Sequence, residues 1–352
     1  MTTIDPAWPR WAEEVTCDDA GPVWVAVDES GSTGENLTDP QGVFAHAAIR
    51  IDDETAESVL AELRDRAKVT QAPEVKFKQF TKLRGLQALA DALAPGGALA
   101  GRVIITVADK QFLIASKMID LLIEEAAHEQ GIDLYSDGSA RQMAVTLFRD
   151  GPRGLGELWE PLKAAFVSLA RATQRGAGEK ETVELFFARL EQARWRCYRR
   201  SVEDLLKMLL TTRAHAEDLV RSTEQRRSGL FPGLDPLVTM LPLTLHHIYA
   251  EHGSVRLLHD EQKVLTSEFT HDLLWHLWNP YPGLPHGGKT RVAEFCTGRS
   301  HRHPSIQLAD LAASAGRVVT EAQLGGSSTE AEALTDAVVP LIRDRLTADP
   351  AR

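Results

Sequence analysis

The chain has 352 residues, of which 43% are hydrophobic and 25% charged, and a net charge of −11; these values exclude wholesale disorder, fibrous repeats and a uniformly basic protein that coats nucleic acid. No apolar run approaches the ~20 residues of a membrane span, and the start, Met1 to Pro6, lacks the basic flank and apolar stretch of a secretory signal. The three cysteines, Cys17, Cys197 and Cys296, lie far apart without CxxC spacing, which argues against a disulfide framework or a cysteine zinc site and favours a reducing cytoplasm.

The first part of the chain alternates strand and helix signals. Residues 1–20 have no clear period and are expected to form an arm. Strands are predicted over 23–27, 43–51 and 103–108, helices over 54–67 and 83–93, and a strand or edge segment over 75–80. The first two strands are expected to pair antiparallel, and the strand that ends at Asp109 to run parallel to the first. This alternation is typical of an α/β sheet.

Helical periodicity dominates from about Phe112 to Tyr249, where strand signals are weak. The α/β pattern then resumes with strands over 255–261 and 292–296, a helix up to about Trp278 and another that opens at Pro304. A last helix begins at Thr329 with capping-box spacing. We therefore predict an α/β core over 21–130 and 250–320, a helical insertion over 131–249, and a C-terminal helix and tail over 321–352.

Acidic residues follow three of the predicted strands: Asp28 with Glu29, Asp109, and Asp260 with Glu261. Ligands of open α/β sheets collect at the ends of strands, so acids that recur there are informative. A single acid in such a place more often only marks where a strand meets solvent. Three together favour a shared site without settling the question.

A fourth acid, Asp310, lies on a predicted helix. Gln307, Asp310 and Ser314 share one face of this helix, and the neighbouring face carries Leu308, Leu311, Ala312 and Ala315. Small residues let the helix lie close to a sheet, which would bury the carboxylate, and burial is costly unless a cation or hydrogen-bond donors satisfy it. A capping hydrogen bond is one solution, and a divalent cation is the other. Converging carboxylates are the ligands that Mg²⁺ and Mn²⁺ require, and a pair of these ions can promote phosphodiester cleavage.

Five segments of the chain resemble the uncharacterised bacterial family DUF3800, and they occur in the order Val25–Gly31, Glu74–Lys76, Val107–Lys110, His259–Glu261 and Ser305–Leu311. The resemblance spans Val23 to Gly316 without the helical middle. It implies a ribonuclease H-like mixed sheet flanked by helices. It also implies a metal-dependent nuclease-like core in which four acids are candidate ligands of Mg²⁺ or Mn²⁺, namely Asp28, Asp109, Asp260 and Asp310.

Several further residues near these acids are candidates for supporting roles. Lys76 could hold a phosphate or orient a water molecule, and Glu74, two residues earlier, could be another ligand; a surface ion pair between the two is equally expected. Residues that could orient or adjoin the ligands are Gln307, Ser30, Glu29 and Glu261. His303 precedes the Asp310 helix and could reach a metal or a phosphate.

The strongest basic patch surrounds Trp195 and consists of Arg194, Arg196, Arg199 and Arg200. Arginines interleaved with aromatic residues suit phosphate contact and base stacking. On a helix, however, Trp195 and Tyr198 could equally belong to the core, with the arginines as the solvated face, and this second interpretation is slightly favoured.

These patterns lead to two hypotheses of function. The first is a Mg²⁺- or Mn²⁺-dependent nuclease or related phosphodiesterase that acts on DNA or RNA through its carboxylate cluster. The alternative is a catalytically silent module that binds nucleic acid or protein on the same fold. Oligomeric state cannot be inferred from the sequence.

Overall fold

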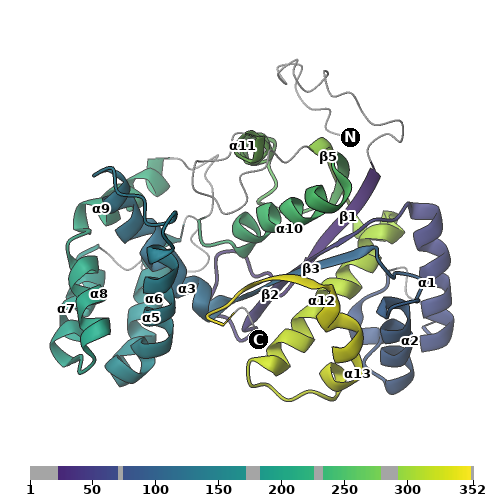
Figure 1. The fold of residues 1–352 in the computed structure, drawn as a ribbon, viewed down its shortest axis with the longest axis horizontal. Helices are drawn as coiled ribbons and strands as arrows, with labels where there is room; N and C mark the ends of the chain where they lie inside the picture. The colour runs from purple at the N-terminus through teal and green to yellow at the C-terminus, as the bar shows by residue number, and fades with distance from the viewer. Residues whose placement is uncertain (1–22, 70–73, 172–182, 226–232, 279–291, 350–352) are drawn as a thin grey trace.

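The structure, a computed structural model, describes residues 23–69, 74–171, 183–225, 233–278 and 292–349. The arm expected over 1–20 lies outside these residues. The described chain forms a mixed α/β fold in which helices flank one six-stranded sheet (Figure 1). None of the described helices combines the length and the apolar character that a membrane crossing requires.

The sheet has the strand order β5-β4-β1-β2-β3-β6. Its strands are β1 (Val23–Ser30), β2 (Val43–Ile49), β3 (Val103–Asp109), β4 (Val255–Asp260), β5 (Val292–Gly298) and β6 (Ile342–Leu346). β2 is antiparallel to both β1 and β3, whereas β4, β5 and β6 pair parallel with their neighbours. The predicted antiparallel pairing of the first two strands is therefore confirmed, and β3 has the same direction as β1, as expected.

Four helices cover one face of the sheet: α1 (Asp53–Ala67), α2 (Leu83–Leu93), α12 (Pro304–Gln323) and α13 (Thr329–Val338). Among them α12 lies directly against β1 and β2. The small residues of α12 permit this close approach: a Cβ atom added at Gly316 would lie only 2.7 Å from Cγ2 of Ile105 on β3. The apolar face predicted for this helix is buried, since Leu308, Leu311 and Ala312 are each at most 1% exposed.

The other face of the sheet packs against α10 (Pro236–His252) and α11 (Ser267–Trp278). Residues Leu237, Leu241 and Leu245 of α10 contact a core that includes Val25 and Phe44. The sequence had assigned α10 to the helical insertion, yet this helix covers the sheet. Hydrophobic spacing alone does not reveal which surface a helix will bury.

The remaining helices form a lobe with its own apolar core beside the end of β3 (Figure 1). The expected helix over 112–128 is present as α3 (Lys110–Met118), a π-helical stretch η3 (Ile119–Glu124) and α4 (Glu125–His128). The other members of the lobe are α5 (Ser139–Leu155), η4 (Gly156–Leu158), α6 (Trp159–Ala170), α7 (Val183–Arg196), α8 (Arg200–Leu210) and α9 (Arg213–Gln225).

Two expectations about secondary structure were wrong. Residues 75–80 form no strand but a 3-10 turn, η2 (Phe77–Gln79), because the N–H of Val75 donates to Gln307 Oε1 and the N–H of Lys76 donates to Gln79 Oε1, both at 2.9 Å. The side chains of Gln307 and Gln79 thus occupy two backbone N–H groups that would otherwise bond to a neighbouring strand. The C-terminal tail, expected to lack further structure, contains η6 (Val339–Leu341) and the edge strand β6.

Candidate functional site

Three carboxylates from separate elements meet beside α12: Asp28 on β1, Asp260 on β4 and Asp310 on α12. The parallel register pairs Val27 with His259, so the next residues lie on adjacent strands, Asp28 near the end of β1 and Asp260 at the end of β4. Asp28 lies opposite Ala47, whose side chain belongs to the core on the α12 side of the sheet. Strand pairing therefore places Asp28 beside Asp260, and the docking of α12 against β1 brings Asp310 to the same side of the sheet.

Burial makes this carboxylate cluster electrostatically unfavourable. Asp28 is only 3% exposed, and burial, followed by the charges of Glu29, Asp310 and Asp260, raises its pKa well above the usual value. Burial is also the main cause that raises the pKa values of Asp260 and Asp310. The negative charges of the neighbouring acids thus add to the effect of burial in disfavouring the ionised form of Asp28.

Lys76 supplies positive charge at this place. Its ammonium nitrogen lies 2.8 Å from Oε1 of Glu74 and 3.5 Å from Oδ2 of Asp310. Burial lowers the pKa of Lys76, but the hydrogen bond to Glu74 and the charge of Asp310 outweigh it and raise the pKa to about 12. The predicted pair of Glu74 and Lys76 is thus formed. It belongs to the carboxylate cluster, and its two members precede a 3-10 turn instead of sharing a strand face.

Gln307 and Ser300 join the segments that carry these acids. Gln307 accepts a hydrogen bond from the N–H of Val75 and donates through Nε2 to the carbonyl of Ser300, at 2.9 Å each. Ser300, the first residue of the 3-10 turn η5 (Ser300–Arg302), donates its N–H to Asp260 at 3.0 Å and its hydroxyl to Glu74. The amide of Gln307 therefore holds Val75, the neighbour of Glu74, and Ser300, the residue that donates to Asp260.

Ser30 follows Asp28 by two residues on β1, so its side chain lies on the same face of the sheet, just beyond the cluster. Its hydroxyl is 3.1 Å from that of Ser314 and accepts a hydrogen bond of the same length from Nε of Arg317. Arg317 also pairs with Glu321 at 2.9 Å. A cleft of about 780 Å³ opens here between α12, the η2 turn and the loop before α13, and its lining includes Lys76, Lys78, Asp310, Ser314 and Arg317.

Three of the candidates are not brought into this cluster. Asp109 caps α3 by accepting the N–H groups of Gln111 and Phe112 at 2.8 and 3.3 Å. Asp109 pairs with Val43 of β2, whereas Asp28 pairs with Ala47, four residues further along the same strand. The two acids are therefore separated by roughly 13 Å along the strand direction. Glu261 pairs with the exposed Arg299 at 3.0 Å, and His303 with Asp53 at 2.9 Å. Each of these side chains thus has a local structural partner.

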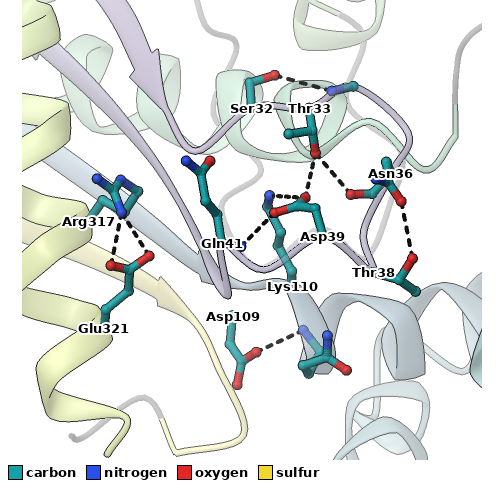
Figure 2. A network of polar contacts seen from close by, with 12 residues as sticks. Ser32, Thr33, Asn36, Thr38, Asp39, Gln41, Asp109, Lys110, Arg317 and Glu321 are labelled. Carbon is teal, nitrogen blue, oxygen red and sulfur yellow. Dashed lines mark hydrogen bonds and ion pairs between the residues drawn. The ribbon is translucent and has the colours of Figure 1, made fainter. Parts of the chain in front are cut away.

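A buried ion pair next to Asp109 anchors the loop between β1 and β2 (Figure 2). The ammonium group of Lys110 contacts Asp39 at 2.6 Å, and the two side chains are 1% and 6% exposed. Thr33 donates its hydroxyl to the same carboxylate. The loop begins at Gly31, where φ is +83° and an added Cβ would lie 2.2 Å from the carbonyl oxygen of Val43. Only glycine fits this turn, which directly follows Asp28, Glu29 and Ser30.

The opposite face of the sheet carries a buried histidine pair that the sequence analysis missed. His259 Nδ1 lies 2.8 Å from the carbonyl oxygen of Asp260, and because a carbonyl only accepts, this nitrogen bears the proton. His259 Nε2 lies 3.3 Å from His46 Nε2, and His46 Nδ1 lies 2.8 Å from the hydroxyl oxygen of Thr244. Burial lowers the pKa of both imidazoles and so favours their neutral forms. The sequence signal for this pair was His46, a histidine within the otherwise apolar strand at 43–49.

Glu29 also points to this second face, since it lies opposite His46. Burial, followed by the charges of Asp235 and Asp260, raises the pKa of Glu29 to about 8. Its Oε2 atom has no hydrogen-bond partner, and the same holds for Oδ2 of Asp310 in the cluster. Within the described ranges, no three His, Cys, Asp or Glu side chains lie close enough to hold a metal ion as they stand.

The arginine-rich segment lies apart from this cluster, in the helical lobe. Trp195 and Tyr198 are 78% and 75% exposed, so the slightly favoured expectation that they belong to the core was wrong. The reason is that α7 buries Phe186, Phe187 and Leu190 instead. Both aromatic side chains are therefore exposed, as are Arg196, Arg199 and Arg200, whereas Arg194 is half-buried.

Comparisons with protein-family models, with curated proteins and with solved structures found no match to the chain. Its function therefore has to be inferred from the chemistry of the residues described above.

Proposed function

We propose that the chain is a divalent-metal-dependent nuclease, a phosphodiester hydrolase that acts on nucleic acid through its carboxylate cluster. The observation that carries this proposal is the convergence of the buried Asp28 with the half-buried Asp260 and Asp310, three acids from three elements whose pKa values are all raised. Buried carboxylates of this kind require a compensating cation, and perturbed pKa values cluster at functional sites.

The sheet supports a ribonuclease H-like fold for this enzyme. Five of its strands have the order β3-β2-β1-β4-β5, with β2 alone running in the opposite direction, and β6 is added at one edge. The cluster lies at the ends of the two central parallel strands, where ligands of α/β sheets bind. Strand order and the placement of Asp28, Asp260 and Asp310 support what the DUF3800-like segments imply, whereas Asp109, the fourth implied ligand, lies outside the cluster.

The donor set fits Mg²⁺ or Mn²⁺, because it consists of carboxylate oxygens, among them the buried Oδ2 of Asp310, which makes no hydrogen bond and lies 3.5 Å from the ammonium nitrogen of Lys76. Asp28, Asp260 and Asp310 would hold the ion, with Glu74 as a further ligand. When bound, such an ion activates water and stabilises the charge that develops on the phosphate. Binding requires the carboxylates to draw together and the ammonium group of Lys76 to leave Asp310.

The remaining residues of the site would bind and orient the substrate. Lys76, freed from Asp310, would contact a phosphate oxygen from the side of the η2 turn. The cleft that begins at Asp310 and Lys76 is also lined by Lys78, Ser314 and Arg317, and Lys78 and the Ser314 hydroxyl would contact phosphates of the same strand. Arg317 is paired with Glu321, which lines the cleft too, so a phosphate would have to compete with this carboxylate for it. Gln307 and Ser300 would keep Glu74 and Asp260 in place.

One observation favours a second candidate function, a catalytically silent binding module on the same fold. Lys76 already pairs with Glu74 and Asp310, so an ammonium group supplies part of the charge that a metal ion would bring. If this pair is permanent, the cleft would bind nucleic acid without cutting it.

Cleavage of labelled single- and double-stranded DNA and RNA in Mn²⁺, Mg²⁺ or EDTA tests the proposal. We expect metal-dependent cleavage that Asp28→Asn reduces by at least ~100-fold, since it removes a ligand charge while keeping size. Asp218→Asn, a change at an exposed ion pair, is the matched control and should leave the rate unchanged. Absence of cleavage in every metal and substrate, with nucleic acid still bound, would select the binding module.

A further inference from the structure

An exposed aromatic pair lies where α7 ends and α8 begins. Trp195 and Tyr198 are 78% and 75% exposed, the highest values among the large hydrophobic residues described as exposed. Exposing two large rings three residues apart is unfavourable for an isolated soluble protein, and such surfaces commonly mark binding sites. The carboxylate cluster uses neither residue.

Positive charge surrounds the two rings in a chain that is acidic overall. Residues 189–200 contain five arginines and one glutamate, whereas the whole chain has a net charge of −11. The guanidinium of Arg194 lies 4.8 Å from the ring centroid of Trp195. Arg196 pairs with the exposed Glu157 at 3.2 Å, and the exposed Arg199 with the half-buried Asp150 at 3.7 Å; ion pairs that face solvent contribute little. Incoming phosphates could therefore recruit these arginines at little cost.

The turn that presents the rings is held by α5. A Cβ atom added at Gly154 of α5 would lie 3.3 Å from Cβ of Arg199 and 3.4 Å from Sγ of Cys197, so the turn packs tightly on this glycine. The N–H of Glu203 also donates to the carbonyl of Arg199 at 2.9 Å, which starts α8 directly after the turn. The rings thus project from a pre-organised segment, which reduces the entropy lost on binding.

We propose that Trp195 and Tyr198, with Arg194, Arg196, Arg199 and Arg200, form a binding surface for single-stranded nucleic acid, distinct from the carboxylate cluster. Unpaired bases stack on the two rings while the arginines contact the backbone phosphates. A duplex is disfavoured because its bases are stacked on one another and cannot reach the rings. Binding at this surface needs no metal ion. The proposal therefore goes beyond the proposed cleavage reaction and can be tested independently of it.

Fluorescence anisotropy in EDTA tests this proposal, with a labelled oligothymidylate of about 16 nucleotides as the probe. We expect Trp195→Ala/Tyr198→Ala to weaken binding at least ~10-fold, because it removes both rings on which bases would stack. Trp195→Phe/Tyr198→Phe retains the stacking surface and should bind within about threefold of the wild type. Trp24→Ala is the matched control, since Trp24 is 39% exposed and lies beneath the guanidinium of Arg256.

Salt dependence separates the role of the arginines from that of the rings. Arg196→Ala/Arg200→Ala should reduce the slope of log affinity against log salt by about 1–2, whereas the control Arg84→Ala should leave it unchanged. Unaltered oligothymidylate binding by Trp195→Ala/Tyr198→Ala would overturn the proposal. Equal affinity for a duplex of the same length would also overturn it. So would a protein that does not bind the oligonucleotide but sediments as a dimer, if only the Trp195→Ala/Tyr198→Ala variant abolishes this dimer.

Discussion

Oδ2 of Asp310 lies 3.5 Å from the ammonium nitrogen of Lys76, and this buried carboxylate oxygen has no hydrogen-bond partner. The lysine itself is held closer by Glu74, at 2.8 Å. The contact between Lys76 and Asp310 is thus the weaker of the two, and it is the one that a metal ion would replace. Lys76 would be a resident counter-ion in the metal-free protein and a phosphate contact in the active complex.

Lys76→Met separates these two states. In EDTA it should lower the melting temperature by a few degrees, because it leaves Asp310 and Glu74 without their cation. Mn²⁺ should then raise the melting temperature more than it does in the wild type, since no ammonium group competes for the carboxylates. Thermal unfolding with and without Mn²⁺ measures both effects. Lys207→Met, at an exposed pair with Glu203, should change neither value.

The neutral pair of His46 and His259 predicts how stability depends on pH. Burial is the main cause that lowers the pKa of both histidines, that of His259 to about 4. Because the folded values lie below the unfolded value near 6.5, the unfolded chain binds more protons as pH falls, and the stability present above pH 6.5 is lost toward pH 4. The loss amounts to about 1.4 kcal/mol per pH unit for each imidazole.

Urea unfolding at several pH values checks this dependence. His46→Gln should make the free energy of unfolding fall less steeply between pH 6.5 and 5, whatever its effect at neutral pH. The exposed His128 offers the control, since His128→Gln leaves the buried pair in place. An unchanged slope for His46→Gln would mean that the pair does not govern acid stability.

Asp39→Asn tests the buried ion pair below the β1–β2 loop. It leaves the ammonium of Lys110, which is 1% exposed, without its counter-charge, and should destabilise the fold by about 3–5 kcal/mol at neutral pH. Although burial opposes it, the hydrogen bond from Lys110 lowers the pKa of Asp39, so this contribution is present above about pH 4 and is lost as pH falls further. Asp65→Asn, at an exposed pair with Lys68, should cost less than ~1 kcal/mol in the same unfolding experiment.

Gly31→Ala probes the turn that follows Asp28. Gly31 and Gly101 both have positive φ, +83° and +67°, but only at Gly31 would an added Cβ collide with backbone, 2.2 Å from the oxygen of Val43. Gly101→Ala should therefore cost about 1 kcal/mol of strain, and Gly31→Ala clearly more. Because the turn positions Ser30 and Asp28, Gly31→Ala should also weaken Mn²⁺ binding. Equal unfolding energies for the two variants would exclude the collision.

Local patterns were enough to predict most of the sheet and the docking of α12. The helix over 83–93 has the predicted bounds, and the face of α12 that carries Gln307, Asp310 and Ser314 lies against the strand ends as its spacing indicated. These features depend on hydrophobic period and small residues within one segment. Such periods are visible in a single sequence.

The features that could not be predicted from the sequence depend on residues that are distant from one another in the chain. Gln307 takes the backbone donor of Val75, 232 residues earlier, so the alternating run around Val75 cannot pair as a strand. His46 and His259 are 213 residues apart, and nothing local marks them as a pair. Asp109 ends a buried strand as Asp28 does, but the register of β2 separates the two acids. Register is a property of the sheet and is not encoded in the acids themselves.

Calorimetric titration of the metal-free protein with Mn²⁺ tests the carboxylate site most directly. The wild type should bind Mn²⁺ more tightly at pH 8 than at pH 6, because the raised pKa of Asp28 makes protons compete with the metal. Asp310→Asn should fold with little loss of stability and show no saturable binding at either pH. Identical binding by the wild type and Asp310→Asn, or a loss of about 1–3 kcal/mol of stability in this variant with binding intact, would contradict a metal site at Asp28, Asp260 and Asp310.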